Sequence, residues 1–228
     1  MIDHTYVIPK KSTKKQSDDP LARPSIIFIV GGTGAGKSTL IANLLMALEK
    51  KHQWDNALFV SGNNRDDLLK SLEMDVTSSP VDLSDYMTKL KQPVTKPTYN
   101  VLVMDDCQSD PSFNIMTGRS QFAQFILSHR HYGKHNGEGG TWIILTAQTL
   151  KGSYTPVIRK NTSLWFTFIP RAIDEEKAIQ DVSGDPDKMK KAMRLQRLED
   201  KHTFLYVNKQ DPTNIRYFMN LDRELDVS

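Results

Sequence analysis

Ile-Ile-Phe-Ile-Val at residues 26–30 runs directly into Gly-Gly-Thr-Gly-Ala-Gly-Lys-Ser at residues 31–38. The first five residues are apolar and mostly β-branched, which is typical of a strand buried on both faces of a parallel sheet. The next eight fit the phosphate-binding pattern G-x-x-x-x-G-K-[ST] at every position. From Ser38 to Lys50, apolar residues recur every three or four positions, which predicts an amphipathic helix. A strand, a glycine-rich loop and a helix in this order predict a nucleotide phosphate site.

The residue types of this loop suit phosphate binding. Glycines let the backbone pass close to phosphate oxygens without a Cβ in the way. Backbone N–H groups at the start of a helix attract anions, and the helix dipole adds to this attraction. We expect Lys37 to reach the β- and γ-phosphates of ATP and Ser38 to ligate Mg²⁺. The residues that we assign to the nucleotide are Gly31, Gly32, Thr33, Gly34, Ala35, Gly36, Lys37, Ser38 and Thr39.

An acidic pair follows a second predicted buried strand, Val101–Met104. Asp105 is in the position to hold the Mg²⁺ with its water shell, so the metal ligands predicted are Ser38 and Asp105. Asp106 would orient or deprotonate the attacking water. Many ATPases carry Glu at this second position, so the shorter Asp leaves the identity of the base open. Gln148, which follows the predicted strand Trp142–Leu145, is our candidate for sensing the γ-phosphate.

Three arginines are candidates for a role across a subunit interface. Multimeric ATPases often supply such an arginine to a neighbour's site, with gains of roughly 10³–10⁵ in rate where this has been studied. The candidates are Arg119, Arg130 and Arg159. For each of them, an ordinary surface salt bridge is the alternative.

The rest of the chain alternates predicted strands with predicted helices. This pattern predicts an α/β fold with a mostly parallel central sheet flanked by helices. The last two strands surround the Asp211-Pro212 turn and predict antiparallel edge strands at the C-terminus. Further strands are predicted at 57–60, 163–168, 203–207 and 215–219, and helices at 64–74, 83–90, 120–132, 174–181 and 186–198.

Composition and length limit the possibilities. The chain has 228 residues and a net charge of +3, which allows one α/β domain but does not by itself favour nucleic-acid binding. We assign residues 24–228 to that domain and residues 1–23 to a basic, partly flexible arm containing four lysines. Cys107 is the single cysteine, so an intrachain disulfide is excluded. The sequence has no run of about 20 apolar residues that would predict a membrane span.

The motifs also allow two other interpretations, a GTPase and a zinc site. Asn208-Lys209-Gln210-Asp211 matches the N-K-x-D pattern with which GTPases read guanine, and residues 181–184 match D-x-x-G. The second match ends a charged helical segment instead of a strand, and Asp105 is a better metal ligand. A nucleotide-dependent switch, GTPase-like through Asn208–Asp211 and without DNA transport, remains the alternative function. The histidines at 129, 131 and 135 lack the H-E-x-x-H spacing of a zinc site.

Five short segments together resemble a known group. They are Gly-Gly-Thr-Gly-Ala-Gly-Lys-Ser at 31–38, Val-Met-Asp-Asp at 103–106, Ser-His-Arg-His-Tyr at 128–132, Ile-Ile-Leu-Thr-Ala-Gln at 143–148 and Ile-Arg-Lys-Asn at 158–161. The chain resembles the viral genome-packaging ATPases of the poxvirus-type family, within the FtsK–HerA class of P-loop NTPases. The resemblance spans roughly residues 24–170.

This resemblance implies a RecA-like ATPase that assembles into a homo-oligomeric ring of five or six subunits. It implies that ATP hydrolysis drives double-stranded DNA, without regard to sequence, into a preformed capsid, and that Arg159 or Arg130 acts in trans. The implied partners are the DNA and capsid vertex proteins. The implied location is the host cytoplasm, at the site of viral assembly, and also the virion. Two sets of residues are candidate contacts to the DNA backbone: Lys134 and His135 in the flexible loop, or Lys89, Lys91 and Lys96.

Overall fold

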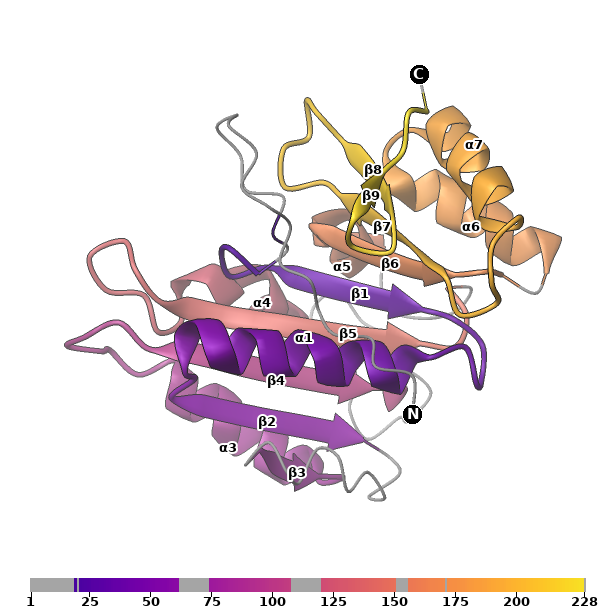
Figure 1. Cartoon of the computed structure of the whole chain (residues 1–228). Coiled ribbons are helices and arrows are strands. Elements are labelled where there is room, and N and C mark those ends of the chain that lie inside the picture. The colour runs from indigo at the N-terminus through magenta and orange to yellow at the C-terminus, as the bar shows by residue number, and fades with distance from the viewer. Residues whose placement is uncertain are drawn as a thin grey trace.

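The computed structural model describes residues 19, 21–61, 74–107, 120–150, 156–170 and 172–227. Within these residues, nine strands form one sheet in the order β3-β2-β4-β5-β1-β6-β7-β8-β9 (Figure 1). The strands are β1 (Ile26–Val30), β2 (Asn56–Ser61), β3 (Asp75–Thr77), β4 (Tyr99–Asp105), β5 (Gly140–Ala147), β6 (Leu164–Phe168), β7 (Phe204–Asn208), β8 (Arg216–Met219) and β9 (Arg223–Glu224).

The sheet has a parallel part and an antiparallel part. Strands β3, β2, β4, β5, β1 and β6 run parallel, whereas β7, β8 and β9 are antiparallel to their neighbours. All parallel strands therefore end at one edge, which we call the carboxyl edge, and the arrowheads in Figure 1 mark it. The opposite edge is the amino edge. The predicted antiparallel strands at the C-terminus are confirmed.

Helices cover both faces of the sheet. Helix α1 (Lys37–His52) lies on one face, and the other described helices pack on the opposite face (Figure 1). Side chains of β1 alternate between two hydrophobic clusters: Ile27 and Ile29 pack with α1, and Phe28 packs with the other helices. Those helices are α3 (Pro80–Leu90), α4 (Gln121–Ser128), α5 (Pro156–Asn161), α6 (Ile173–Ser183) and α7 (Pro186–Gln196).

Most predicted elements are present with small shifts at their ends, but one helix is shorter than predicted and three elements were not predicted. Those three are β3, β9 and α5, which have three, two and six residues and are too short to show a readable period. The helix predicted over 120–132 ends at Ser128 and continues as a 3₁₀ turn, His129–His131. The predicted helix 64–74 and the arm at 1–23 lie almost wholly outside the described residues.

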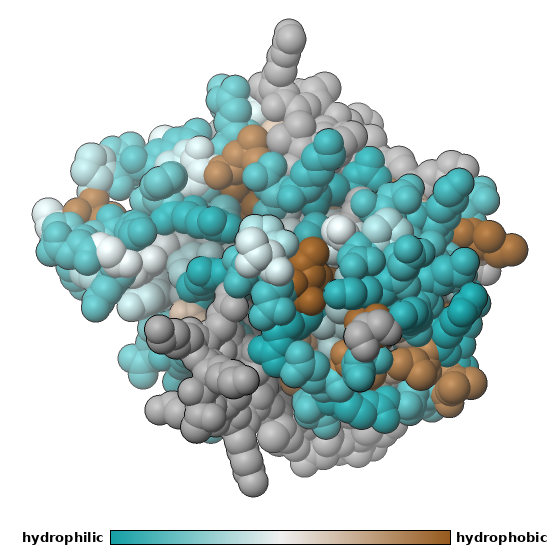
Figure 2. Space-filling model, turned by 90° about the horizontal axis from the view of Figure 1, so that it is seen from above, coloured by the Kyte–Doolittle hydropathy of each residue, from teal (hydrophilic) through white to brown (hydrophobic). Residues whose placement is uncertain are grey.

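The described surface is mainly polar. Figure 2, which views the molecule from above, shows hydrophilic groups over most of this face and hydrophobic groups in small separate patches. None of the helices in the described part of the chain is long and apolar enough to cross a membrane.

The ring of His129 is buried in the 3₁₀ turn, and this position predicts a pH dependence of stability. Its Nδ1 lies 2.7 Å from the carbonyl oxygen of Thr141, to which it donates. Burial lowers the pKa of His129 from 6.5 to about 4. The unfolded chain therefore binds this proton between pH 6.5 and 4 while the folded chain does not. Stability from this residue is complete above pH 6.5 and is lost as the pH falls.

We expect the contribution of His129 to the free energy of unfolding to drop by roughly 2 kcal/mol as the pH falls from 7.5 to 4.5. Urea denaturation of the wild type and of His129→Asn at both pH values measures it. Asparagine keeps an N–H donor but does not titrate, so its pH dependence should be shallower. His131→Asn, the same change at an exposed position, is the control. Equal pH slopes in all three proteins would contradict this prediction.

Candidate nucleotide-binding site

The glycine-rich loop leaves the carboxyl edge of the sheet between β1 and α1. The N–H of Gly31 still donates to the carbonyl oxygen of Ala147 at 3.1 Å, so the loop begins as an extension of the sheet. Gly34 and Gly36 then adopt φ values of 75° and 112°, a left-handed region that favours glycine. Gly36 is the N-cap of α1. The turn thus presents the N-terminus of a 16-residue helix at the end of a buried strand.

Lys37 is the charged centre of the loop. Its side chain is only 9% exposed, and its Nζ donates to the carbonyl oxygen of Gly31 at 2.9 Å. The same Nζ lies 3.6 Å from Oδ2 of Asp106. The structure therefore brings the predicted phosphate-binding lysine next to the predicted acidic pair, although the two are far apart in the sequence.

Thr146 holds the acidic pair in place. Its hydroxyl donates to Oδ1 of Asp105 at 2.6 Å and accepts the backbone N–H of Asp106 at 3.0 Å. Asp106 has a φ of 51°, which is uncommon for a residue other than glycine, and the second of these bonds supports that conformation. Thr146 was not predicted from the sequence. Its only signal was a hydroxyl in a mostly apolar strand, which usually indicates a core position.

Gln148 connects the acidic pair to the loop. Its Nε2 donates to Oδ2 of Asp106 at 3.2 Å, and its Oε1 accepts the hydroxyl of Thr33 at 3.4 Å. One amide thus contacts both the glycine-rich loop and the candidate base. This is the position expected of a group that responds to the γ-phosphate.

The oxygen atoms at this edge suit a magnesium ion. Ser38 is exposed at the start of α1, and Asp105 ends β4. Oδ1 of Asp106 is buried and has no hydrogen-bond partner among the described residues. A buried carboxylate oxygen without a donor is costly unless a cation or its hydration water satisfies it. Hydroxyl and carboxylate oxygens are the ligands that Mg²⁺ prefers, so these residues fit it.

The structure describes two of the three candidate arginines. Arg130 is in the 3₁₀ turn, and its Nη2 donates to the hydroxyl of Ser163 at 3.2 Å, just before β6 begins at the amino edge. Arg159 is in α5, where Nη1 donates to the carbonyl oxygen of Leu150 at 3.5 Å. Its Nε is buried without a partner among the described residues. Arg119 lies outside the described residues. A role in trans for Arg159 or Arg130 stays a prediction.

The guanine-reading interpretation of Asn208–Asp211 is wrong. Asn208 pairs with Leu164 at the amino end of β6, and the N–H of Lys209 donates to the carbonyl oxygen of Ser163 at 2.8 Å. The phosphate loop is at the other end, where Val30 pairs with Thr167. Because β7 is antiparallel, its last residues lie at the amino edge. A base bound beside the phosphate loop cannot reach them.

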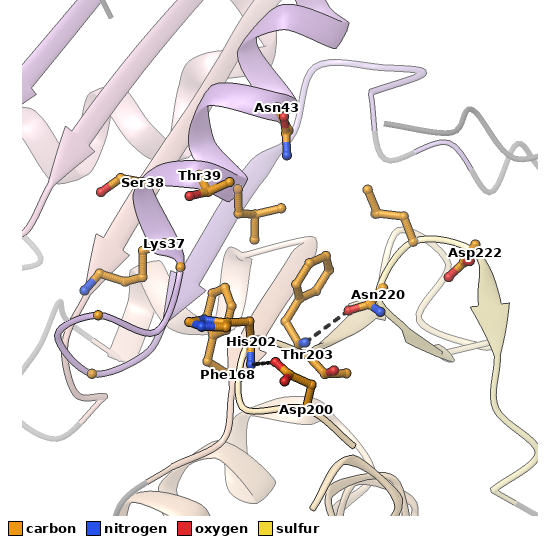
Figure 3. A pocket seen from close by; sticks show the side chains of 16 residues that line it. Lys37, Ser38, Thr39, Asn43, Phe168, Asp200, His202, Thr203, Asn220 and Asp222 are labelled. Atoms are coloured by element: carbon orange, nitrogen blue, oxygen red, sulfur yellow. Dashed lines mark hydrogen bonds between the residues drawn. The ribbon is translucent and has the colours of Figure 1, made fainter. Parts of the chain in front are cut away.

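A pocket of about 880 Å³ opens beside the loop. Its first part is formed by the loop and the first turns of α1 (Figure 3). Its second part comes from the C-terminal strands and the turns between them. The ring of His202 in this second part lies 3.2 Å from the carbonyl oxygen of Ala35, through Nδ1. This part was not predicted from the sequence. Its lining residues are Phe168, Asp200, His202, Thr203, Phe204, Asn220, Leu221 and Asp222.

Comparisons with known proteins identify structures with a similar fold. A family model described as the Schlafen group 3 DNA/RNA helicase domain matches residues 24–126. Comparison with curated proteins gave no match. The genome packaging NTPase B204 from Sulfolobus turreted icosahedral virus 2, solved with sulfate, is 17% identical, with a TM-score of 0.60 over 85% of this chain and 95% of that chain.

Two further solved structures are similar. The DNA-packaging ATPase B204 from Sulfolobus turreted icosahedral virus is 19% identical, with a TM-score of 0.59 over 86% of this chain and 97% of that chain. The pCW3 conjugation coupling protein TcpA, solved with ATPγS, is 16% identical, with a TM-score of 0.54 over 91% of this chain and 62% of that chain. The chain therefore has the fold of these P-loop ATPases, with a mostly parallel sheet and antiparallel strands at its C-terminal end.

Proposed function

We propose that this protein is an ATPase that uses hydrolysis to move double-stranded DNA. The observation that carries the ATPase proposal is the position of Lys37, which lies between the carbonyl oxygen of Gly31 and the carboxylate of Asp106. Phosphate bound by the loop would take over the contacts of this lysine. The same event would release Asp106 from the lysine, so nucleotide binding and activation of the base are coupled.

Each residue then has a chemical task. Lys37 and the backbone N–H groups of the loop neutralise and position the phosphates. Asp106 orients the attacking water and accepts its proton, and Gln148 links that carboxylate to Thr33. Ser38 and Asp105 would hold Mg²⁺, which would supply positive charge to neutralise the phosphate oxygens.

The motor proposal draws on the structural likeness to a DNA-packaging ATPase and to a conjugation coupling protein. We infer a ring of five or six copies in which Arg159 or Arg130 completes the site of a neighbour. In that setting the DNA would be gripped through its phosphates and driven into a capsid through contacts with vertex proteins. The site of action would be the host cytoplasm and the virion.

A second candidate function is a nucleic-acid helicase. The observation that favours it is the match of residues 24–126 to a DNA/RNA helicase domain, because this range includes the phosphate loop and the acidic pair. A helicase separates strands, whereas a packaging motor moves an intact duplex.

The test is ATP hydrolysis with and without linear double-stranded DNA, over a range of salt concentrations. We expect stimulation that falls steeply with salt, because contacts to phosphates release counterions. A strand-displacement assay under the same conditions separates the two functions. Unwinding would favour the helicase. An equal rate of hydrolysis with and without DNA, at every salt concentration, would support an ATPase but contradict the motor proposal.

Thr146 should matter for this activity as a positioning residue. Thr146→Val keeps the shape of the side chain but leaves Asp105 without one donor and the N–H of Asp106 without its acceptor. We expect kcat to fall roughly 10- to 100-fold, given 1–3 kcal/mol for a buried group left unsatisfied. The KM for ATP should change little, and Thr146→Ser should restore kcat. A rise in KM together with a fall in kcat, in both Thr146→Val and Thr146→Ser, would indicate a structural role instead.

A further inference from the structure

The second part of the pocket, which we call the C-terminal half, has features that the phosphates do not use. It is contiguous with the phosphate loop but is built from the end of β6 and from the turns that flank β7 and β8. A pocket of about 880 Å³ is large enough for a complete nucleotide. The triphosphate occupies the loop, so the ribose and the base must lie toward α1 or toward this half. The inference below rests on the proposed ATPase function.

Aromatic side chains form one wall of this half. The rings of Phe168 and Phe204 meet edge to face, with centroids 5.6 Å apart. Phe168 packs closely on the loop, because a Cβ added at Gly31 would lie 2.9 Å from the Cβ of Phe168. A Cβ at Gly36 would lie 3.4 Å from Phe168 and 3.8 Å from the ring of His202. Aromatic rings therefore lie next to the phosphate-binding turn, which suits the packing of a planar base.

Polar groups form the rim. Asn220 has a φ of 55°, and its side chain accepts the N–H of Phe204 at 3.2 Å, which fixes the turn after β8. Its amide N–H₂ remains as a donor. The carboxylate of Asp222 makes no hydrogen bond or ion pair with any described residue. Figure 3 shows Asn43 of α1 across the pocket from Asn220 and Asp222.

The two halves of the pocket differ in charge. Among the described residues that line the pocket, Lys37 is the only lysine or arginine, and it belongs to the phosphate half. The C-terminal half contains two carboxylates, Asp200 and Asp222. The first accepts the N–H of His202 at 2.8 Å, so it shapes the turn. The carboxylate of Asp222 has no hydrogen-bond or ion-pair partner among the described residues, so it is suited to accept a hydrogen bond from an amino group.

We propose that the C-terminal half binds the base of the nucleotide, and that it selects a purine with an exocyclic amine, adenine in the ATPase. Phe204 and His202 supply the surface on which the base packs, and Asp222 and Asn220 supply an acceptor and a donor at its edge. The base is thereby read by the C-terminal strands at the carboxyl edge, and not by Asn208–Asp211 at the other edge.

The experiment measures Kd by calorimetry for ATPγS, for ITP, which lacks the amine, and for inorganic tripolyphosphate, which lacks base and ribose. Three variants are compared with the wild type: His202→Ala, Asp222→Asn and Lys37→Ala. Asp211→Asn is the matched control, because it makes the same change at the amino edge. Far-ultraviolet circular dichroism verifies that each variant is folded.

We expect His202→Ala to weaken ATPγS roughly tenfold and tripolyphosphate by less than about twofold. Asp222→Asn should remove most of the preference for ATPγS over ITP, and Asp211→Asn should change neither. Equal losses for ATPγS and tripolyphosphate in His202→Ala would overturn the proposal, as would an ATPγS-to-ITP ratio unchanged by Asp222→Asn. Failure of the ATPase proposal itself is distinguishable, because wild type would then bind neither ATPγS nor tripolyphosphate and Lys37→Ala would change nothing.

Discussion

Replacing Lys37 with alanine should abolish ATP hydrolysis, lowering kcat/KM at least roughly 10³-fold. Lys37 is buried beside the loop and, in the part of the chain that the structure describes, is the only lysine or arginine that lines the phosphate pocket. Its loss removes a charge that stabilises the transferring phosphoryl group in a site of low dielectric. The loss also leaves the carboxylate of Asp106 without the ammonium group 3.6 Å away. Steady-state phosphate release and ATP binding, measured on the same preparation, test this.

The control for this variant is Lys50→Ala. Lys50 lies in the last turn of the same helix, is exposed, and has no described contact with the pocket. Its replacement should leave kcat and KM unchanged. Residual activity in Lys37→Ala above a tenth of wild type would show that the loop is not the hydrolytic centre.

Replacing Asp106 with asparagine should lower kcat by roughly 10²–10⁴-fold, the range for loss of a general base. ATP binding should persist or tighten, because a negative charge is removed beside the phosphates. Asparagine tolerates the left-handed φ of 51° at this position, so the backbone should be retained. Single-turnover hydrolysis, together with the Kd for ATPγS, separates the chemical step from binding.

Asp85→Asn, on the exposed face of α3, provides the matched control. If Asp106→Asn retained at least half of the wild-type kcat, Asp106 would not be the base. Asp105, which accepts the hydroxyl of Thr146, would then be the next candidate for the base and the next residue to replace. The departure from the more common glutamate makes this experiment informative, since the shorter side chain must reach the water from a strained backbone position.

The features that could be predicted from the sequence are those that depend on neighbouring residues in the chain. The run from Ile26 to Ser38 encodes a buried strand, a loop that needs glycine at Gly34 and Gly36, and a helix, and all three are present. The acidic pair and Gln148 were also predictable, because polar residues directly after a buried parallel strand must lie at its carboxyl edge. Backbone conformation and burial of consecutive residues explain these predictions.

Contacts between residues from distant segments could not be predicted, because they depend on how the strands are ordered in the sheet. Thr146 contacts the acidic pair because β4 and β5 are neighbours in the sheet, and periodicity does not encode strand order. The same holds for His202, which reaches Ala35 because β7 runs antiparallel to β6 and so begins at the carboxyl edge. That direction also places Asn208–Asp211 at the amino edge, although the motif looks like a base-reading loop. Strand order and direction are set by packing across the whole sheet, which no local pattern specifies.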